Sequence, residues 1–234
     1  SIPADKQGQE NLLRSLMNVR LPRPISKYFL KIQDEYLTER NIERGITDVD
    51  TLAPTKFDSR LYIWQGDITT LKCDAIVNAC NSQMLGCFSP MHACIDNFIH
   101  TYAGVELRLK MHEIMTKQGH EEETGKAKIT SGYNLPAKYV LHTVGPIIQW
   151  KVTQEDENLL ASCYKECLKL AADTGVESIA FCCLSTGVFR FPQQRAAEIA
   201  TETVMQFLKK DDRIKKVIFN VFKNEDLEIY SHLL

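Results

Sequence analysis

Short apolar runs alternate with longer amphipathic stretches from residue 61 onward. Runs that suit buried strands occur at Leu61–Trp64, Ala75–Val77, Ala127–Thr130, Tyr139–Val144, Ile179–Leu184 and Val217–Phe222. Apolar residues at helical spacing follow at Val105–Met115, Asn158–Ala172, Gln193–Leu208 and Glu225–Leu233. Strands flanked by helices favour a mostly parallel sheet covered on both faces. We therefore expect an α/β domain that binds its ligand where loops leave the carboxyl ends of the strands.

The first 56 residues have a different, helical pattern. Apolar residues recur at helical spacing over residues 9–17, and Pro22 and Pro24 then interrupt the chain. Ser26 is a suitable cap for a second helix, and Gly45 is a plausible end for it. We expect residues 1–56 to form a helical extension packed on a main domain of residues 57–234, most simply as a scaffold without a catalytic role.

Composition narrows the class of protein. Hydrophobic residues make up 44% and charged residues 25% of the 234 residues, which is typical of a globular domain. The formal net charge of −2 offers no basic surplus for a nucleic-acid backbone. No apolar run approaches the roughly 18 residues of a membrane span, and the first residues lack a secretory pattern. The eight cysteines include several in apolar stretches, so we expect free thiols and a cytoplasmic location.

Three predicted loops carry residues suited to a nucleotide-like ligand. Asp67 follows a strand and a glycine, where a carboxylate can accept a hydrogen bond from an exocyclic amine. Asn78 and Asn81 lie at the exit of a buried strand, where one amide can lock the loop and the other can face a sugar hydroxyl. The small residues of 185–189 lie between a strand and a helix, where backbone N–H groups attract anions. Each signal alone is also common in ordinary turns.

Together, these loops resemble the macrodomain family over roughly residues 60 to 222. The resemblance is carried by Gly-Asp-Ile-Thr, Ala-Ile-Val-Asn-Ala-x-Asn-Ser, His-Thr-Val-Gly-Pro and Ser-Thr-Gly-Val-Phe, in that order. It implies a three-layer α/β/α fold with a mixed, mostly parallel central sheet. It also implies that Asp67 and Ile68 contact adenine and that Asn81 faces the distal ribose of ADP-ribose. The remaining implied contacts, to the diphosphate, come from Ser185, Thr186, Gly187, Val188 and Phe189. The last strand would line the adenine side.

Cys87, His92 and Cys94 form a Cys-x4-His-x-Cys pattern just after Asn81. Thiolate and imidazole suit Zn²⁺, and three protein ligands are the number found in catalytic zinc sites with one open position. The alternative is two buried thiols and a surface histidine. The pattern replaces the glycine-rich loop of ordinary hydrolytic macrodomains and resembles a zinc-containing branch of that family, as does the segment of residues 11–20. We therefore expect one Zn²⁺ per chain.

The resemblance to this branch implies removal of mono-ADP-ribose from modified proteins and a possible cognate ADP-ribosyltransferase partner. Hydrolysis at the anomeric carbon of the distal ribose needs an activated water and help for the leaving group. Zinc would bind that water or a substrate oxygen, Asn81 would orient the ribose, and Asp96 would orient water or act as base; His100 is a further candidate. The alternatives are a non-catalytic ADP-ribose reader with structural zinc and an O-acetyl-ADP-ribose deacetylase.

The other histidines and cysteines do not form a second site. His142 ends a predicted buried strand and is interpreted as structural, whereas His112, His120 and His232 are expected to face solvent. Core packing is the expected role of the cysteines at positions 73, 80, 163 and 167.

Overall fold

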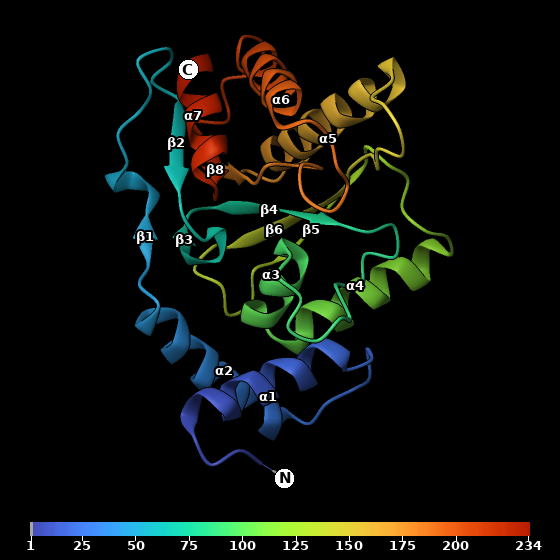
Figure 1. Ribbon diagram of the computed structural model, residues 1–234. Helices are drawn as coiled ribbons and strands as arrows, with labels where there is room; N and C mark the ends of the chain where they lie inside the picture. The colour runs from blue at the N-terminus through green and yellow to red at the C-terminus, as the bar shows by residue number, and fades with distance from the viewer. Residues whose placement is uncertain (1) are drawn as a thin grey trace.

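Six strands form the central sheet of the computed structural model, which describes residues 2–234 (Figure 1). They are β2 (Leu61–Gln65), β4 (Ala75–Cys80), β5 (Ala127–Ser131), β6 (Tyr139–Val144), β7 (Ser178–Phe181) and β8 (Lys216–Val221). The strand order is β2-β8-β7-β4-β6-β5, and every neighbouring pair is parallel except β5 with β6. This confirms the mixed, mostly parallel sheet.

Helices cover both faces of the sheet. On one side lie α5 (Gln154–Asp173), α6 (Gln193–Leu208) and α7 (Asn224–Leu233), and on the other α3 (Ile95–Ala103) and α4 (Val105–Gln118) (Figure 1). The buried strands are rich in Val, Ile and Ala, as expected for a sheet covered on both faces. The main hydrophobic core therefore lies between this sheet and its helices, and the three-layer α/β/α expectation is confirmed.

Two helices precede this sandwich and pack outside α3 and α4 (Figure 1). They are α1 (Lys6–Val19), capped by Asp5, and α2 (Lys27–Glu43), capped by Ser26. Gly45 follows α2 with φ of +84°, a left-handed conformation that glycine tolerates, so the predicted helix end is confirmed. A small apolar cluster of Met17, Leu37 and Val105 joins these helices to α4.

Short elements complete the connection from α2 to the sheet. The two-residue strands β1 (Thr47–Asp48) and β3 (Leu71–Lys72) pair in parallel. Two single turns of 3₁₀-helix are η1 (Val49–Thr51) and η2 (Ile68–Thr70), and η2 begins at Asp67. Within residues 2–234, no helix is both long enough and apolar enough to cross a membrane.

The sequence pattern located all six strands of the main sheet and six of the seven α-helices. It missed α3, and it extended one strand too far, because Ile179–Leu184 leaves the sheet after Phe181. The pairing of β7 with β4 is confined to Ala75 with Ile179 and Ile76 with Ala180. Beyond these two pairs the strands diverge, and residues 182–184 run toward the loop that begins at Ser185.

Candidate active site

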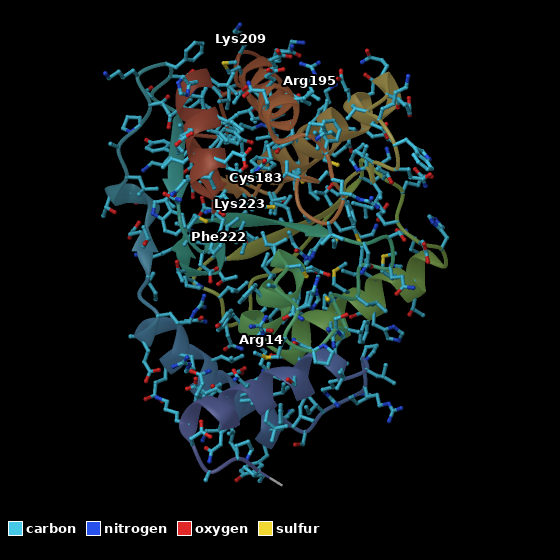
Figure 2. The ribbon with its side chains drawn as sticks, in the orientation of Figure 1. Arg14, Cys183, Arg195, Lys209, Phe222 and Lys223 are labelled. Carbon is cyan, nitrogen blue, oxygen red and sulfur yellow. The ribbon has the colours of Figure 1, made fainter. Side chains whose placement is uncertain are left out.

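The carboxyl ends of the parallel strands lie at one edge of the sheet, so the loops that follow them gather there. Asp67 follows β2, Asn81 follows β4, Gly145 follows β6 and Ser185 lies beyond β7. Phe222, which is 75% exposed, follows β8 at the same edge (Figure 2). The chain therefore brings together the loops that sequence reasoning singled out.

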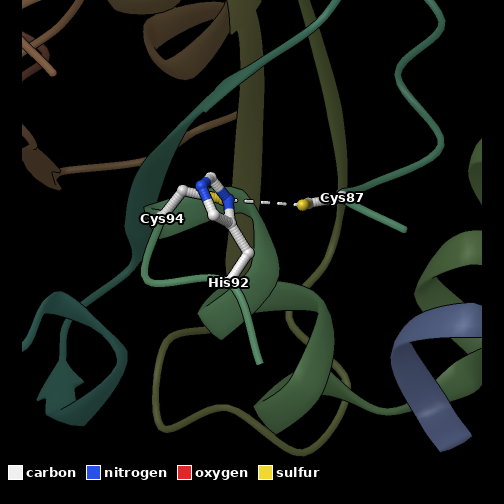
Figure 3. A group of neighbouring side chains, drawn as sticks. All are labelled: Cys87, His92 and Cys94. Carbon is white, nitrogen blue, oxygen red and sulfur yellow. Dashed lines mark hydrogen bonds between the residues drawn. The ribbon is translucent and has the colours of Figure 1, made fainter. Parts of the chain in front are cut away.

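Cys87, His92 and Cys94 converge in the loop between β4 and α3 (Figure 3). Their ligand atoms all lie within 4.8 Å of one another, and Cys87 Sγ is 3.5 Å from His92 Nδ1. Neighbouring donors in a tetrahedral zinc site lie roughly 3.5–4 Å apart, given bonds of about 2.0–2.3 Å. The three side chains thus fit a zinc ion with little movement. They are the one such group of three or more potential ligands in the part of the chain that the structure describes.

Cys94 has a second function as the N-cap of α3. Its Sγ accepts a hydrogen bond from the backbone N–H of Asn97 at 3.4 Å. Burial raises the pKa of the Cys94 thiol to about 12. A divalent cation bound at Cys94 would stabilise the thiolate, because a cysteine must lose its proton to bind a metal.

Asp96 lies in the first turn of α3 and is 5% exposed. Its Oδ1 accepts a hydrogen bond from Asn78 Nδ2 at 2.8 Å, and the same amide group lies 3.2 Å from His142 Nδ1. The other nitrogen of His142 is 3.0 Å from Thr130 Oγ1. Burial raises the pKa of Asp96 to about 6, although the Asn78 hydrogen bond and the Arg108 charge act in the opposite direction. Asp96 is therefore anchored to the sheet through Asn78.

His100 lies one helical turn beyond Asp96, and its Nε2 is 3.6 Å from Asp96 Oδ1. The ring is buried, and neither nitrogen has a hydrogen-bond partner. Burial, with the nearby His142 and the Arg108 charge, lowers the pKa of His100 well below its usual range. Gly86, with φ of +82°, passes directly over the ring: a Cβ there would come within 2.7 Å of it.

Asp67 is held by groups from its own turn and from the N-terminal extension. Its Oδ1 accepts hydrogen bonds from the Thr69 backbone N–H at 2.9 Å and the Thr69 hydroxyl at 2.6 Å. Its Oδ2 forms an ion pair with Arg44, whose guanidinium lies 3.5 Å from the ring centroid of Tyr102. Ile68 is 4% exposed, so its side chain is mainly part of the core.

The predicted anion-binding loop begins at Ser185, which has φ of +63° and a buried hydroxyl without a hydrogen-bond partner. Thr186 donates its hydroxyl to the Cys183 carbonyl at 3.0 Å, and Gly187 and Val188 are exposed. The Phe189 carbonyl accepts a hydrogen bond from the Ile148 N–H at 2.8 Å, which ties this loop to the one after β6.

Asn81 is exposed at the end of β4 and shapes its own turn, because its Oδ1 accepts a hydrogen bond from the Gln83 N–H at 3.1 Å. Within residues 2–234, its amide nitrogen has no hydrogen-bond partner. His142 is fully buried, and His112, His120 and His232 are exposed, as predicted. The cysteines expected to pack in the core, at positions 73, 80, 163 and 167, are buried free thiols.

Sequence reasoning missed the residues that support this site from a distance. Arg44 contacts Asp67, and the buried Arg108 donates to the Cys87 carbonyl at 3.3 Å. Neither arginine stands in a recognisable pattern. The sequence suggested that one of the two asparagines locks the loop and the other faces a sugar hydroxyl. In the structure Asn78 bonds Asp96 of α3, and Asn81 bonds the backbone of its own turn.

The comparisons with known proteins match these features. A model of the Macro domain family matches residues 77–200. A protein from Treponema medium named protein-ADP-ribose hydrolase is 57% identical over 100% of this chain and 90% of its own length. A protein of the same name from Staphylococcus aureus strain MRSA252 is 52% identical over 98% of this chain and 86% of its own length.

Solved structures give the same assignment. The Trypanosoma brucei macrodomain in complex with ADP-ribose aligns with a TM-score of 0.73 at 28% identity, covering 94% of each chain. An Oceanobacillus iheyensis macrodomain mutant with ADPR aligns with a TM-score of 0.67 at 39% identity, covering 74% of this chain and 90% of its own. The chain belongs to the macro domain family.

Proposed function

We propose that this enzyme removes mono-ADP-ribose from modified proteins and that it does so with one zinc ion bound by Cys87, His92 and Cys94. The enzyme class follows its relatives, since proteins named protein-ADP-ribose hydrolase are 51–57% identical to it over nearly the whole chain. The zinc requirement rests on one observation: three soft or borderline ligands converge within 4.8 Å in the loop between Asn81 and Asp96.

The adenine end of ADP-ribose would lie at Asp67 and Ile68. Asp67 has a fixed carboxylate that can accept a hydrogen bond from the adenine amino group. The diphosphate would lie against residues 185–189, which are Ser185, Thr186, Gly187, Val188 and Phe189. Two observations support that assignment. The buried hydroxyl of Ser185 has no hydrogen-bond partner, so it can bind a ligand oxygen. The hydrogen bond from the Ile148 N–H to the Phe189 carbonyl fixes this loop to the loop after β6.

The distal ribose would lie between Asn81 and the metal ligands. Bound zinc would supply a Lewis acid at the scissile end. Asn81 would orient a ribose hydroxyl through its amide. Asp96, held by Asn78 at 2.8 Å, would orient the attacking water or accept its proton. His100 would act through Asp96, because its ring lies 3.6 Å from that carboxylate and is otherwise buried.

The proposal also includes the domain organisation of the chain, its cellular location and its protein partners. Residues 1–56 would be an extension of a macrodomain of residues 57–234. Eight free cysteines are consistent with the reducing cytoplasm. We also propose that the enzyme acts with a cognate ADP-ribosyltransferase. This partnership is supported by a Fusarium oxysporum protein named probable bifunctional ADP-ribose hydrolase/ADP-ribosyltransferase, which is 42% identical over 95% of this chain and 40% of its own length.

Cys87→Ser tests the role of the metal. Bound zinc measured by elemental analysis should fall, and release of ADP-ribose from a mono-ADP-ribosylated protein should slow by on the order of 100-fold. Cys73→Ser is the matched control, because Cys73 is a buried thiol at the amino end of β4 whose Sγ contacts the Ala75 carbonyl at 3.2 Å. A Cys87→Ser protein that lacks zinc and hydrolyses at the native rate would contradict the proposal. Tight ADP-ribose binding without any release by the native protein would make the chain a reader instead.

A further inference from the structure

The loop that carries Cys87, His92 and Cys94 takes most of its hydrogen bonds from neighbouring helices. Within the loop, the His92 N–H reaches the Ser89 carbonyl at a long 3.3 Å. The stronger bonds come from outside, including one at 2.9 Å from Asn97 Nδ2 of α3 to the same Ser89 carbonyl. Met91 also holds φ of +57°, an uncommon conformation for a residue with a side chain. The loop therefore depends on its surroundings for its shape.

Two residues of helix α1 bond the loop backbone, one at Met91 and the other at His92. The Met91 N–H donates to Asn18 Oδ1 at 3.0 Å, and Arg14 Nη2 donates to the His92 carbonyl at 3.1 Å. Asn18 is 1% exposed and is itself fixed by donating to Thr101 Oγ1 at 3.1 Å. Two residues of the N-terminal extension, Asn18 and Arg14, thus restrict the backbone position of His92.

Arg14 extends from α1 toward α3 (Figure 2). Besides the His92 carbonyl, its guanidinium donates to Asn97 Oδ1 from Nη2 at 2.8 Å and from Nε at 3.3 Å. Its Cζ also lies 4.2 Å from the ring centroid of Phe98. One planar group therefore joins α1, α3 and the loop, a geometry that a flexible ammonium does not reproduce.

Arg108 of α4 also links α1 to this loop. Its Nη1 donates to three carbonyls at the end of α1, those of Met17, Asn18 and Arg20, at 2.6–3.1 Å. Its other nitrogens donate to the carbonyls of Leu85 at 2.7 Å and Cys87 at 3.3 Å. The buried guanidinium of Arg108 thus binds both the end of α1 and the first part of the loop that carries Cys87, His92 and Cys94.

We infer that α1 is part of the metal site and that Arg14 is a positioning residue for the ligand His92. The inference rests on the metal assignment proposed above. Cys94 is held by α3 and the Cys87 carbonyl by Arg108, whereas His92 is exposed and takes its support from α1. Groups that fix metal ligands commonly change metal affinity by about 10- to 100-fold when they are removed.

The test measures zinc release from the full chain into a colorimetric chelator. Arg14→Ala should release zinc about tenfold faster than the native protein, and Arg14→Lys should fall between them because a lysine can keep only part of the contact. Arg40→Ala is the matched control: it removes an arginine whose Nη2 lies 3.4 Å from Glu10 of α1, so it loosens α1 without touching the loop. We expect Arg40→Ala to release zinc at the native rate. Circular dichroism confirms that each variant is folded.

The outcomes separate this inference from the proposal beneath it. If the native chain binds zinc and Arg14→Ala releases it at the native rate, the positioning role is wrong and the metal site stands. If Arg40→Ala releases zinc as fast as Arg14→Ala, the effect is a general weakening of α1, which also overturns the inference. A native chain that binds no zinc would overturn the metal site itself.

Discussion

Replacing Asn78 by Leu removes the buried donor that joins Asp96 to the central sheet. Asn78 is fully buried in β4, and its amide nitrogen lies 2.8 Å from Asp96 Oδ1 and 3.2 Å from His142 Nδ1. A hydrogen bond to a charged group contributes about 1.5–3 kcal/mol, and one to a neutral group about 1 kcal/mol. Leucine has a similar volume and regains part of this through apolar burial, so the free energy of unfolding should fall by about 2–3 kcal/mol.

The catalytic consequence should exceed the loss of stability. Without Asn78, the Asp96 carboxylate loses its hydrogen bond to the sheet and with it a fixed orientation. Misplacement of a reacting group by about 1 Å can slow a reaction on the order of 100-fold, so we expect kcat to fall at least about tenfold. Urea unfolding followed by fluorescence gives the stability, and release of ADP-ribose from a modified protein at saturating substrate gives kcat.

Ser178→Ala is the control for stability. Ser178 lies at the amino end of β7, away from the carboxyl-end loops, and its hydroxyl accepts from the Asp74 N–H at 2.8 Å and contacts Asp74 Oδ2 at 3.1 Å. This variant should be destabilised with unchanged kcat. The reasoning is refuted if Asn78→Leu loses less than about 0.5 kcal/mol, the range of ordinary surface substitutions. It is also refuted if both variants lose kcat equally.

Three further perturbations test other parts of the site. Gly145→Ala would put a Cβ 2.1 Å from Ser185 Oγ, so ADP-ribose binding measured by calorimetry should weaken about tenfold, and an unchanged Kd would argue against the diphosphate loop. Arg44→Ala removes the ion pair with Asp67, so the Kd for AMP should rise severalfold; if only the melting temperature changes, Arg44 has a purely structural role. Burial lowers the pKa of His142 to about 3, so the unfolded chain binds a proton at this residue before the folded chain does. The contribution of this group to stability is complete above about pH 6.5 and falls by about 1.4 kcal/mol per pH unit between about pH 6.5 and pH 3. His142→Gln should reduce that slope in urea unfolding, and identical slopes would contradict the assignment.

The fold was largely predictable because its strands and helices have clear hydrophobic periods. The exception is α3, although Ile95, Phe98, Ile99 and Tyr102 are spaced as one helical face. The helix has only nine residues, and it is capped by Cys94 rather than by one of the usual capping residues. Both features weaken a helix signal, and the cysteine was interpreted only as a metal ligand.

The convergence of Cys87, His92 and Cys94 was predictable because the three residues lie within eight positions of one another in the sequence. The arginine contacts that support these residues were not predictable from the sequence. Arg14 and the His92 carbonyl are 78 positions apart, and Arg44 and Asp67 are 23 apart. Nothing local distinguishes these arginines from solvated surface charges, because their partners are set by how α1 and α2 pack on the sandwich. The extension, expected to be a scaffold, supplies contacts both to the loop that carries His92 and to Asp67.

The most direct test of the account is the release of ADP-ribose from a mono-ADP-ribosylated protein by native, chelator-stripped and zinc-restored enzyme. The account predicts release by the native enzyme, loss of on the order of 100-fold or more after stripping, and recovery when zinc is returned. Circular dichroism on the stripped protein checks that the fold survives. Release at the native rate by folded, zinc-free enzyme would contradict the central claim that Cys87, His92 and Cys94 hold a metal that the reaction needs.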